Sequence, residues 1–259
     1  MHTALTIAGS DSSGGAGIQA DLKTFAAHGV FGTSAITAIT AQNTVGVTAV
    51  VALDPGMVAA QIDAVIDDLG AGATKIGMLA NAAIARVVAG ALERHQLTNV
   101  VLDTVMMSKS RATLLDEEAI GVLRDEVLPL AHLITPNVPE AERLTGRAIR
   151  DVDDLKRAAE ALVRGGARAA LVKGGHLDTP TAVDVLFDGR TWIELGATRI
   201  PGRHTHGTGC TLSAAIAARF ALGDVLADAV RGAKDYVTRA IAQAPGLGRG
   251  HGPLQHFPR

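Results

Sequence analysis

The sequence of 259 residues is poor in cysteine and in aromatic residues and lacks an excess of basic residues, and each of these features excludes a class of protein. It has one cysteine, Cys210, so no disulfide can form within the chain and no multi-thiolate metal site can exist. Aromatic residues make up only 3%, and 24 Lys and Arg against 26 Asp and Glu leave a formal charge of -2. We therefore expect no nucleic-acid partner, and a reduced, cytoplasmic setting.

The longest uncharged stretch lies between Gly29 and Leu53 and is long enough for a membrane span. It contains several threonines, with Gln42 and Asn43 near its middle, so two buried strands joined by a polar turn explain it better. The N-terminus has no basic region before an apolar stretch and reaches Asp11 quickly, so we expect no secretory signal. We expect no membrane partner.

Hydrophobic residues make up 47% of the chain and charged residues 19%, which is enough to fill a large core. Short β-branched runs alternate with longer Ala-rich helical patterns, and the apolar run Val100–Leu102 is typical of a parallel strand buried on both faces. The sequence therefore predicts an α/β fold with a mainly parallel central sheet, in one domain over residues 1–259 with an irregular tail from Pro245. The predicted strands are Thr3–Ala8, Gly32–Thr40, Val47–Ala52, Thr74–Gly77, Asn99–Asp103, His132–Thr135 and Arg168–Lys173, then a hairpin of Val183–Leu186 and Thr191–Leu195. The predicted helices are Ile18–His28, Gly56–Asp68, Ala82–His95, Asp116–Val127, Asp153–Arg164, Gly209–Ala221 and Leu226–Ala242.

Ligands of such sheets bind beyond the carboxyl ends of the strands, so these ends are where a site is expected. The first strand is followed by a loop rich in serine and glycine, from Gly9 to Gly17. Glycines here allow a tight turn and a close approach by a ligand. The spacing matches neither G-x-G-x-x-G nor G-x-x-x-x-G-K-[ST], so a flexible turn and a ligand loop are equally good interpretations.

Two carboxylates follow later strands. Asp103 lies at the tip of a buried strand, and Glu140 lies near the start of a short helix that Pro139 opens. Together they could hold Mg²⁺, but from position alone a turn and an ordinary helix start explain them better.

The segment from His204 to Ser213 carries the clearest signal. A helix that begins at Gly207 and Gly209 leaves backbone N–H groups unpaired, which makes an anion hole for a transferred phosphoryl group. The helix dipole would lower the pKa of the Cys210 thiol at this place, although a small buried cysteine is the alternative. Lys173, which precedes two glycines, could bind nucleotide phosphates, and Gln42 could recognise a heterocycle. Either residue could instead belong to a turn whose hydrogen bonds are already satisfied.

Taken together, these segments resemble the hydroxymethylpyrimidine and hydroxymethylpyrimidine-phosphate kinases, within the ribokinase-like superfamily. The resemblance implies a three-layer α/β/α fold, ATP and Mg²⁺, and two successive phosphorylations of 4-amino-5-hydroxymethyl-2-methylpyrimidine in thiamin biosynthesis, by a homodimer. The matching segments are Ala8–Lys23, Thr40–Thr44, Lys75–Leu79, Thr135–Asn137, Val172–His176 and His206–Thr211.

The resemblance also implies residue roles. Cys210, which replaces the usual aspartate base of the superfamily, would lie nearest the acceptor hydroxyl, either as a base or as a positioning group. Gly207, Thr208 and Gly209 would form the anion hole, and ATP would contact Thr208 and Gly209 together with Asn137 and Lys173. Asp103 and Glu140 would hold Mg²⁺. The residues implied to surround the pyrimidine are Gly9, Asp21, Gln42, Met78 and Val105.

The chain departs from the family pattern at two places: Thr104 replaces a proline and Arg111 a glycine. Fine specificity and the second phosphorylation therefore stay open. The alternatives are a pyridoxal or pyridoxine kinase, a cysteine hydrolase with His204 or His206 as its base, and a non-catalytic nucleotide or vitamin sensor.

Overall fold

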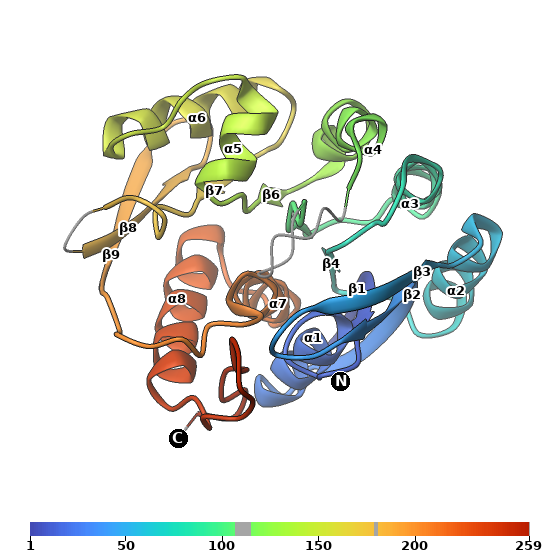
Figure 1. Ribbon diagram of the computed structural model, residues 1–259. Coiled ribbons are helices and arrows are strands. Elements are labelled where there is room, and N and C mark those ends of the chain that lie inside the picture. Colours follow the sequence, from blue (N-terminus) through green and yellow to red (C-terminus); the bar gives the residue numbers. More distant parts are fainter. Residues whose placement is uncertain (107–114, 179–180, 259) are drawn as a thin grey trace.

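A computed structural model describes residues 1–106, 115–178 and 181–258 of the chain. Its centre is a nine-stranded sheet in the order β3-β2-β1-β4-β5-β6-β7-β8-β9 (Figure 1). Neighbouring strands from β2 to β7 pair in parallel, whereas β3 at one edge and the β8–β9 hairpin at the other are antiparallel. The strands are β1 Thr3–Asp11, β2 Phe31–Gln42, β3 Val47–Ala52, β4 Ala73–Ile76, β5 Val100–Leu102, β6 Leu133–Ile134, β7 Ala170–Val172, β8 Thr181–Phe187 and β9 Trp192–Thr198.

Helices cover both faces of the sheet, with α1, α7 and α8 on one face and α2 to α6 on the other (Figure 1). The helices are α1 Gly17–Ala27, α2 Pro55–Asp68, α3 Ala82–Arg94, α4 Glu117–Val122, α5 Val138–Thr145, α6 Val152–Arg164, α7 Thr208–Ala221 and α8 Leu226–Ala242. Strand β5 shows how the layers form, because Val100 and Leu102 join one hydrophobic core and Val101 joins the other. The predicted three-layer α/β/α fold is confirmed.

The predicted helix Asp116–Val127 is only partly right. Asp116 caps α4 by accepting the backbone N–H of Ala119 at 2.8 Å, but the helix changes to a π turn over Leu123–Val127. A 3-10 turn over Leu128–Leu130 follows. Hydrophobic spacing cannot distinguish these tighter and wider turns from a regular helix, which is why the sequence predicts one element here.

The order of the strands reverses at β1, which lies between β2 and β4. A reversal of this kind opens a crevice at the carboxyl ends of the two central strands, and the chain leaves both ends through the predicted ligand segments. Beyond the last helix, residues 245–258 form no helix or strand, yet Leu254 and His256 are buried. Within the described ranges, no helix is long and apolar enough to span a membrane.

Candidate active site

The start of α7 is built from glycine for steric reasons. Gly207 has a left-handed backbone with φ of +80°, and a Cβ there would clash with the carbonyl oxygen of Gly15. The helix begins at Thr208 and has no side-chain cap, whereas the side chains of Asp54 and Asn81 cap α2 and α3. No side chain therefore occupies the first amides of α7, although the N–H of Thr208 donates a long hydrogen bond to the carbonyl of Thr205 at 3.4 Å.

Lys173 and Asp103 meet beside this helix start. Their Nζ and Oδ1 atoms are 3.3 Å apart, and the lysine side chain is 14% exposed against 2% for the carboxylate. A Cβ at Gly209 would lie 3.3 Å from Lys173 Nζ and 3.6 Å from Asp103 Oδ2, so a side chain here would crowd both groups. Asp103 Oδ2 is buried and has no hydrogen-bond partner within the described residues. We call Lys173 and Asp103 the open pair.

Lys173 keeps its positive charge despite its burial. Burial opposes the positive charge of Lys173, but the carboxylates of Asp103 and Glu140 more than offset this and hold the pKa of the lysine above its ordinary value. The cation therefore persists at neutral pH, next to the amides of α7.

Glu140 and Asn137 open α5 with a reciprocal cap. The backbone N–H of Asn137 donates to Glu140 Oε2 at 2.9 Å, and that of Glu140 donates to Asn137 Oδ1 at 3.0 Å. Asn137 also forms a backbone bridge to Lys173, which joins this cap to the open pair. Burial raises the pKa of Glu140, Lys173 opposes this shift, and the charge of Asp103 adds to it.

Thr104 belongs to the same group. Its hydroxyl is buried and donates to Glu140 Oε2 at 3.0 Å, a contact that the family's proline at this place could not make. This departure therefore fixes the Glu140 carboxylate instead of disturbing it. The other departure, at Arg111, lies outside the described residues, as do Lys109 and Ser110.

A second buried lysine, Lys75, pairs with Asp21. The contact between Lys75 Nζ and Asp21 Oδ2 is 2.8 Å, both side chains are 0% exposed, and the hydroxyl of Thr6 donates to the same oxygen at 2.6 Å. We call Lys75 and Asp21 the closed pair. Burial opposes the charge of Lys75, but Asp21 raises the pKa of the lysine well above its ordinary value. Asp21 Oδ1 has no hydrogen-bond partner in the described part of the chain.

The charges of both pairs act on the thiol of Cys210. Burial raises the pKa of its thiol to about 12, with Lys75 opposing this shift and the carboxylates of Asp103 and Asp21 adding to it. The prediction that the helix dipole lowers this pKa is therefore wrong, because desolvation outweighs every favourable charge near the sulfur. Cys210 is a thiol at neutral pH in the ligand-free protein.

The residues predicted to surround a pyrimidine are only partly together. A Cβ at Gly9 would lie 2.8 Å from Met78 Cε, which places these two residues in contact across the ends of β1 and β4. Val105 is half-buried and donates its N–H to the carbonyl of Asp103 at 2.9 Å. The fourth, Asp21, lies in the closed pair.

Gln42, the fifth predicted pyrimidine residue, has other partners. Its Oε1 accepts the hydroxyl of Thr40 at 3.1 Å, and its Nε2 lies 3.2 Å from His206 Nε2. The side-chain amide is therefore part of the hydrogen-bonded turn that the sequence left open as an alternative.

Sequence reasoning missed the role of Asp11 and misread that of His206. His206 Nε2 lies 2.8 Å from Asp11 Oδ2, and the same carboxylate accepts the backbone N–H groups of Ser13 and Ala16, each at 2.8 Å. Burial opposes the charge of Asp11, but the hydrogen bonds from His206 and Ser13 hold its pKa below the ordinary value. This pair ties the loop after β1 to the start of α7, so His206 already has a partner other than Cys210. An aspartate two residues before a serine in a glycine loop is the signal that could have indicated the turn.

A mainly parallel α/β sheet with an uncapped, glycine-built helix start beside a buried Lys–Asp pair defines a ribokinase-like kinase. More closely, the chain belongs to the phosphomethylpyrimidine kinase family, whose model matches residues 11–255.

Among curated relatives, the hydroxymethylpyrimidine/phosphomethylpyrimidine kinase of Rhizobium meliloti is 53% identical over 259 residues, covering 99% of this chain and 97% of that protein. The thiamine biosynthesis bifunctional protein ThiED of Geobacter sulfurreducens is 49% identical over 253 residues, which are 98% of this chain but only 52% of that protein.

Two solved structures share the fold at substantial identity. The pyridoxal kinase of Bacillus subtilis in its ADP complex superposes with a TM-score of 0.91 at 41% identity, covering 99% of this chain and 97% of that one. The phosphomethylpyrimidine kinase of Clostridium difficile 630 gives a TM-score of 0.84 at 46% identity, covering 93% and 100%.

Proposed function

We propose that this chain uses ATP to phosphorylate the hydroxymethyl group of 4-amino-5-hydroxymethyl-2-methylpyrimidine, and then phosphorylates the monophosphate to the pyrophosphate. The observation that carries the proposal is the open pair at the uncapped start of α7, in a chain 53% identical to a hydroxymethylpyrimidine/phosphomethylpyrimidine kinase over nearly its whole length. These two reactions are the ones for which the relatives are named.

Phosphoryl transfer needs alignment and neutralised charge more than covalent chemistry. The amides of Gly207, Thr208 and Gly209 would stabilise the charge that develops on the transferred group. Lys173, a persistent cation next to Gly209, would neutralise phosphate oxygens of ATP, and Asn137 lies one backbone bridge away. A bound nucleotide would therefore place its terminal phosphate between the open pair and Cys210.

The carboxylates fit Mg²⁺. Asp103 Oδ2 is buried without a partner, and the charge of Asp103 acts on nearby Glu140. Mg²⁺ prefers oxygen ligands and is commonly held by one or two carboxylates together with substrate phosphates. Asp103 and Glu140 would hold the ion, which when bound would supply charge neutralisation at the phosphates. The hydroxyl of Thr104 keeps Glu140 oriented for this role.

Cys210 would position the acceptor alcohol. A thiol with a pKa of about 12 is a poor base at neutral pH, but it can hold the hydroxymethyl oxygen in line with the phosphate. The alcohol proton would then leave with the phosphoryl oxygens. We assign the flat ring to the strand ends beside Gly9, Met78 and Val105, where Asp21 Oδ1 and a displaced Gln42 amide would be the polar groups left to recognise it.

Pyridoxal is the second candidate acceptor, and the 41% identity to a Bacillus subtilis pyridoxal kinase favours it specifically. Both molecules present a hydroxymethyl group on a flat nitrogen heterocycle. A combined vitamin kinase would use the same open pair and the same thiol for both.

An ADP-release assay with the hydroxymethylpyrimidine, its monophosphate and pyridoxal in parallel tests the proposal. We expect ADP release with both pyrimidines, and a higher kcat/KM for them than for pyridoxal. A strong preference for pyridoxal would make the second candidate the function. Nucleotide binding without ADP release in any of the three reactions would make the chain a sensor.

We also propose that the chain forms a homodimer in the cytoplasm. Apolar side chains are exposed on neighbouring segments of β2 and β3, where Ile39 is 52%, Val50 47% and Val51 62% exposed. A second copy that covers this patch would remove it from water. Sedimentation equilibrium should give about twice the chain mass of 26.6 kDa, and a concentration-independent monomer would contradict the dimer.

A further inference from the structure

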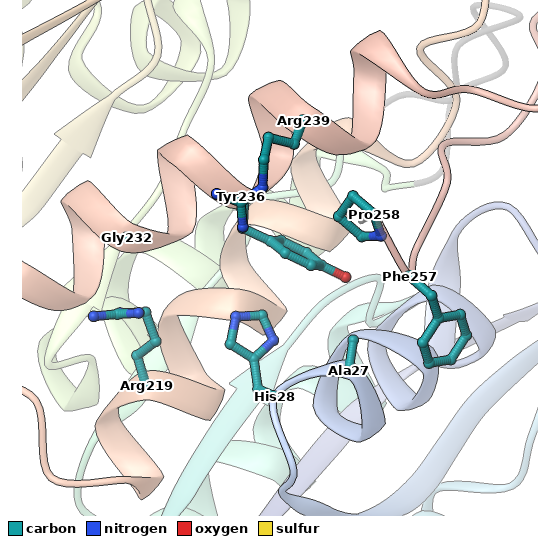
Figure 2. A pocket seen from close by; sticks show the side chains of 8 residues that line it. All are labelled: Ala27, His28, Arg219, Gly232, Tyr236, Arg239, Phe257 and Pro258. Atoms are coloured by element: carbon teal, nitrogen blue, oxygen red, sulfur yellow. The ribbon is translucent and has the colours of Figure 1, made fainter.

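A pocket of about 340 Å³ lies at the far end of α7 from the candidate active site. It is formed where the ends of α1 and α7 meet α8 and the last residues of the chain (Figure 2). Figure 2 shows Arg219 at one end of the pocket and Phe257 with Pro258 at the other. The lining residues are Ala27, His28, Arg219, Gly232, Tyr236, Arg239, Phe257 and Pro258.

The pocket carries more positive than negative charge. Arg219 contacts Asp224 at 2.6 Å through its Nη2, but its Nε is buried and has no hydrogen-bond partner within the described residues. For Arg239 the described part of the chain shows no ion pair. Two guanidinium groups thus face one carboxylate, and one buried N–H donor is left unsatisfied. Asp224 therefore does not satisfy the whole Arg219 guanidinium, and an anion bound beside this group would offset the cost of the unpaired donor.

The positive charges of the pocket also act on the pKa of His28. Burial lowers the pKa of its imidazole, and the charges of Arg219 and Arg239 lower it further, against the opposing effects of the Thr24 carbonyl and Asp224. The imidazole is neutral at pH 7 and packs edge-on against Tyr236, with ring centroids 4.6 Å apart. The hydroxyl of Tyr236 is already used, since it donates to the carbonyl of His256 at 2.6 Å. The groups left to bind an anion are therefore Arg239, which has no ion pair in the described part of the chain, and the part of the Arg219 guanidinium that Asp224 does not occupy.

Glycine at position 232 makes room for one of them. A Cβ there would clash with the guanidinium of Arg219, including its Cζ and Nε atoms, so this group lies directly against the backbone of α8. Arginine is well suited to phosphate because its planar fork can donate two hydrogen bonds at once. Phe257, 55% exposed at the other end, offers an apolar ring face.

We propose that this pocket binds a small organic phosphate, with the phosphate between Arg219 and Arg239 and a flat ring against Phe257 and Pro258. The volume falls in the range of small-molecule sites. The site is separate from the open pair, which lies at the opposite end of α7. It does not depend on the identity of the acceptor that the chain phosphorylates.

Isothermal titration with phenyl phosphate, and with inorganic phosphate for comparison, tests the proposal. We expect Arg239→Gln to weaken phenyl phosphate binding about tenfold, because a charge-assisted contact is lost. The matched control is Arg164→Gln, since Arg164 is 67% exposed on α6, on the other face of the sheet. Phe257→Ala should weaken phenyl phosphate binding about threefold and leave inorganic phosphate unchanged.

Two further variants keep the test decisive. Gly232→Ala retains every charge but displaces the Arg219 guanidinium, so it should weaken binding as Arg239→Gln does, while circular dichroism shows a folded chain. Lys173→Gln separates the pocket from the candidate active site and should leave the phenyl phosphate Kd unchanged in this pocket. The proposal is overturned if binding survives Arg239→Gln and Gly232→Ala but is lost in Lys173→Gln, or if the wild type does not bind at millimolar phenyl phosphate.

Discussion

The chain contains two buried lysine–aspartate pairs, and they differ in how completely they are closed. Lys75 and Asp21 are 2.8 Å apart, both are 0% exposed, and Thr6 adds a hydrogen bond. Lys173 and Asp103 are 3.3 Å apart and the lysine is 14% exposed. One carboxylate oxygen in each pair, Asp21 Oδ1 and Asp103 Oδ2, has no hydrogen-bond partner within the described residues, so distance and exposure separate the pairs. The chemistry of the two pairs is the same, so their surroundings decide what each can do.

Position relative to the strand ends explains the difference. Lys75 lies inside β4 and its partner Asp21 lies inside α1, so helix and sheet cover the closed pair. Lys173 and Asp103 each lie one residue beyond a strand, after β7 and β5, where the sheet opens towards the start of α7. The comparison teaches that a buried ion pair inside an element supports the fold, whereas one just beyond the strands is available to a ligand.

The largest expected effect is on the closed pair. Lys75→Met leaves Asp21 buried without its cation, so we expect the free energy of unfolding to fall by about 3 to 5 kcal/mol. The double variant Asp21→Leu with Lys75→Met removes both charges and should recover most of that loss. Urea unfolding measures both variants. If the single variant kept wild-type stability, the closed pair would not support the fold.

The open pair should respond in activity instead. Lys173→Gln removes the cation beside α7, so we expect kcat for ADP release to fall about 100- to 1,000-fold. The amide can still donate to Asp103, so the free energy of unfolding should fall by less than about 2 kcal/mol. Lys156→Gln is the matched control, because this lysine pairs with Glu194 at 2.6 Å on the surface. Equal losses of activity in Lys173→Gln and Lys156→Gln would show that the open pair has no specific role in turnover.

Alkylation of Cys210 sharpens the comparison, because the charges of both pairs act on its sulfur. With a pKa of about 12, the thiol should react with iodoacetamide at pH 8 about 100-fold more slowly than a free cysteine. Raising the pH increases the thiolate fraction, so the rate should rise through pH 10 without a plateau near 8.5. Mass spectrometry can follow the reaction unambiguously, since the chain has one cysteine. A plateau near pH 8 would restore the thiolate that the sequence predicted.

Periodicity and strand ends predicted the layers of the fold and the segments that meet at the crevice. Gly207, Asp103 and Lys173 could be found because each lies at the end or start of a regular element. The closed pair could not be found in the same way, because Lys75 is a single charged residue in a short buried strand and its partner is 54 residues away.

The pKa of Cys210 could not be predicted for a related reason. The helix start is visible in the sequence, but burial by other segments is not, and burial determines the direction of the shift. Gln42 shows the same limit, since its partner His206 is 164 residues away. Contacts between distant segments fix both side chains, and a single sequence does not contain them.

The most direct test is the turnover of Cys210→Ala, since this residue lies where the account places the acceptor alcohol. Circular dichroism and ADP binding should match the wild type, because the open pair and the amides of α7 are intact. Steady-state ADP release with the hydroxymethylpyrimidine should fall at least about 100-fold, as the alcohol loses its positioning group. A kcat near that of the wild type would contradict the role of the thiol, and with it the placement of phosphoryl transfer between Cys210 and the open pair.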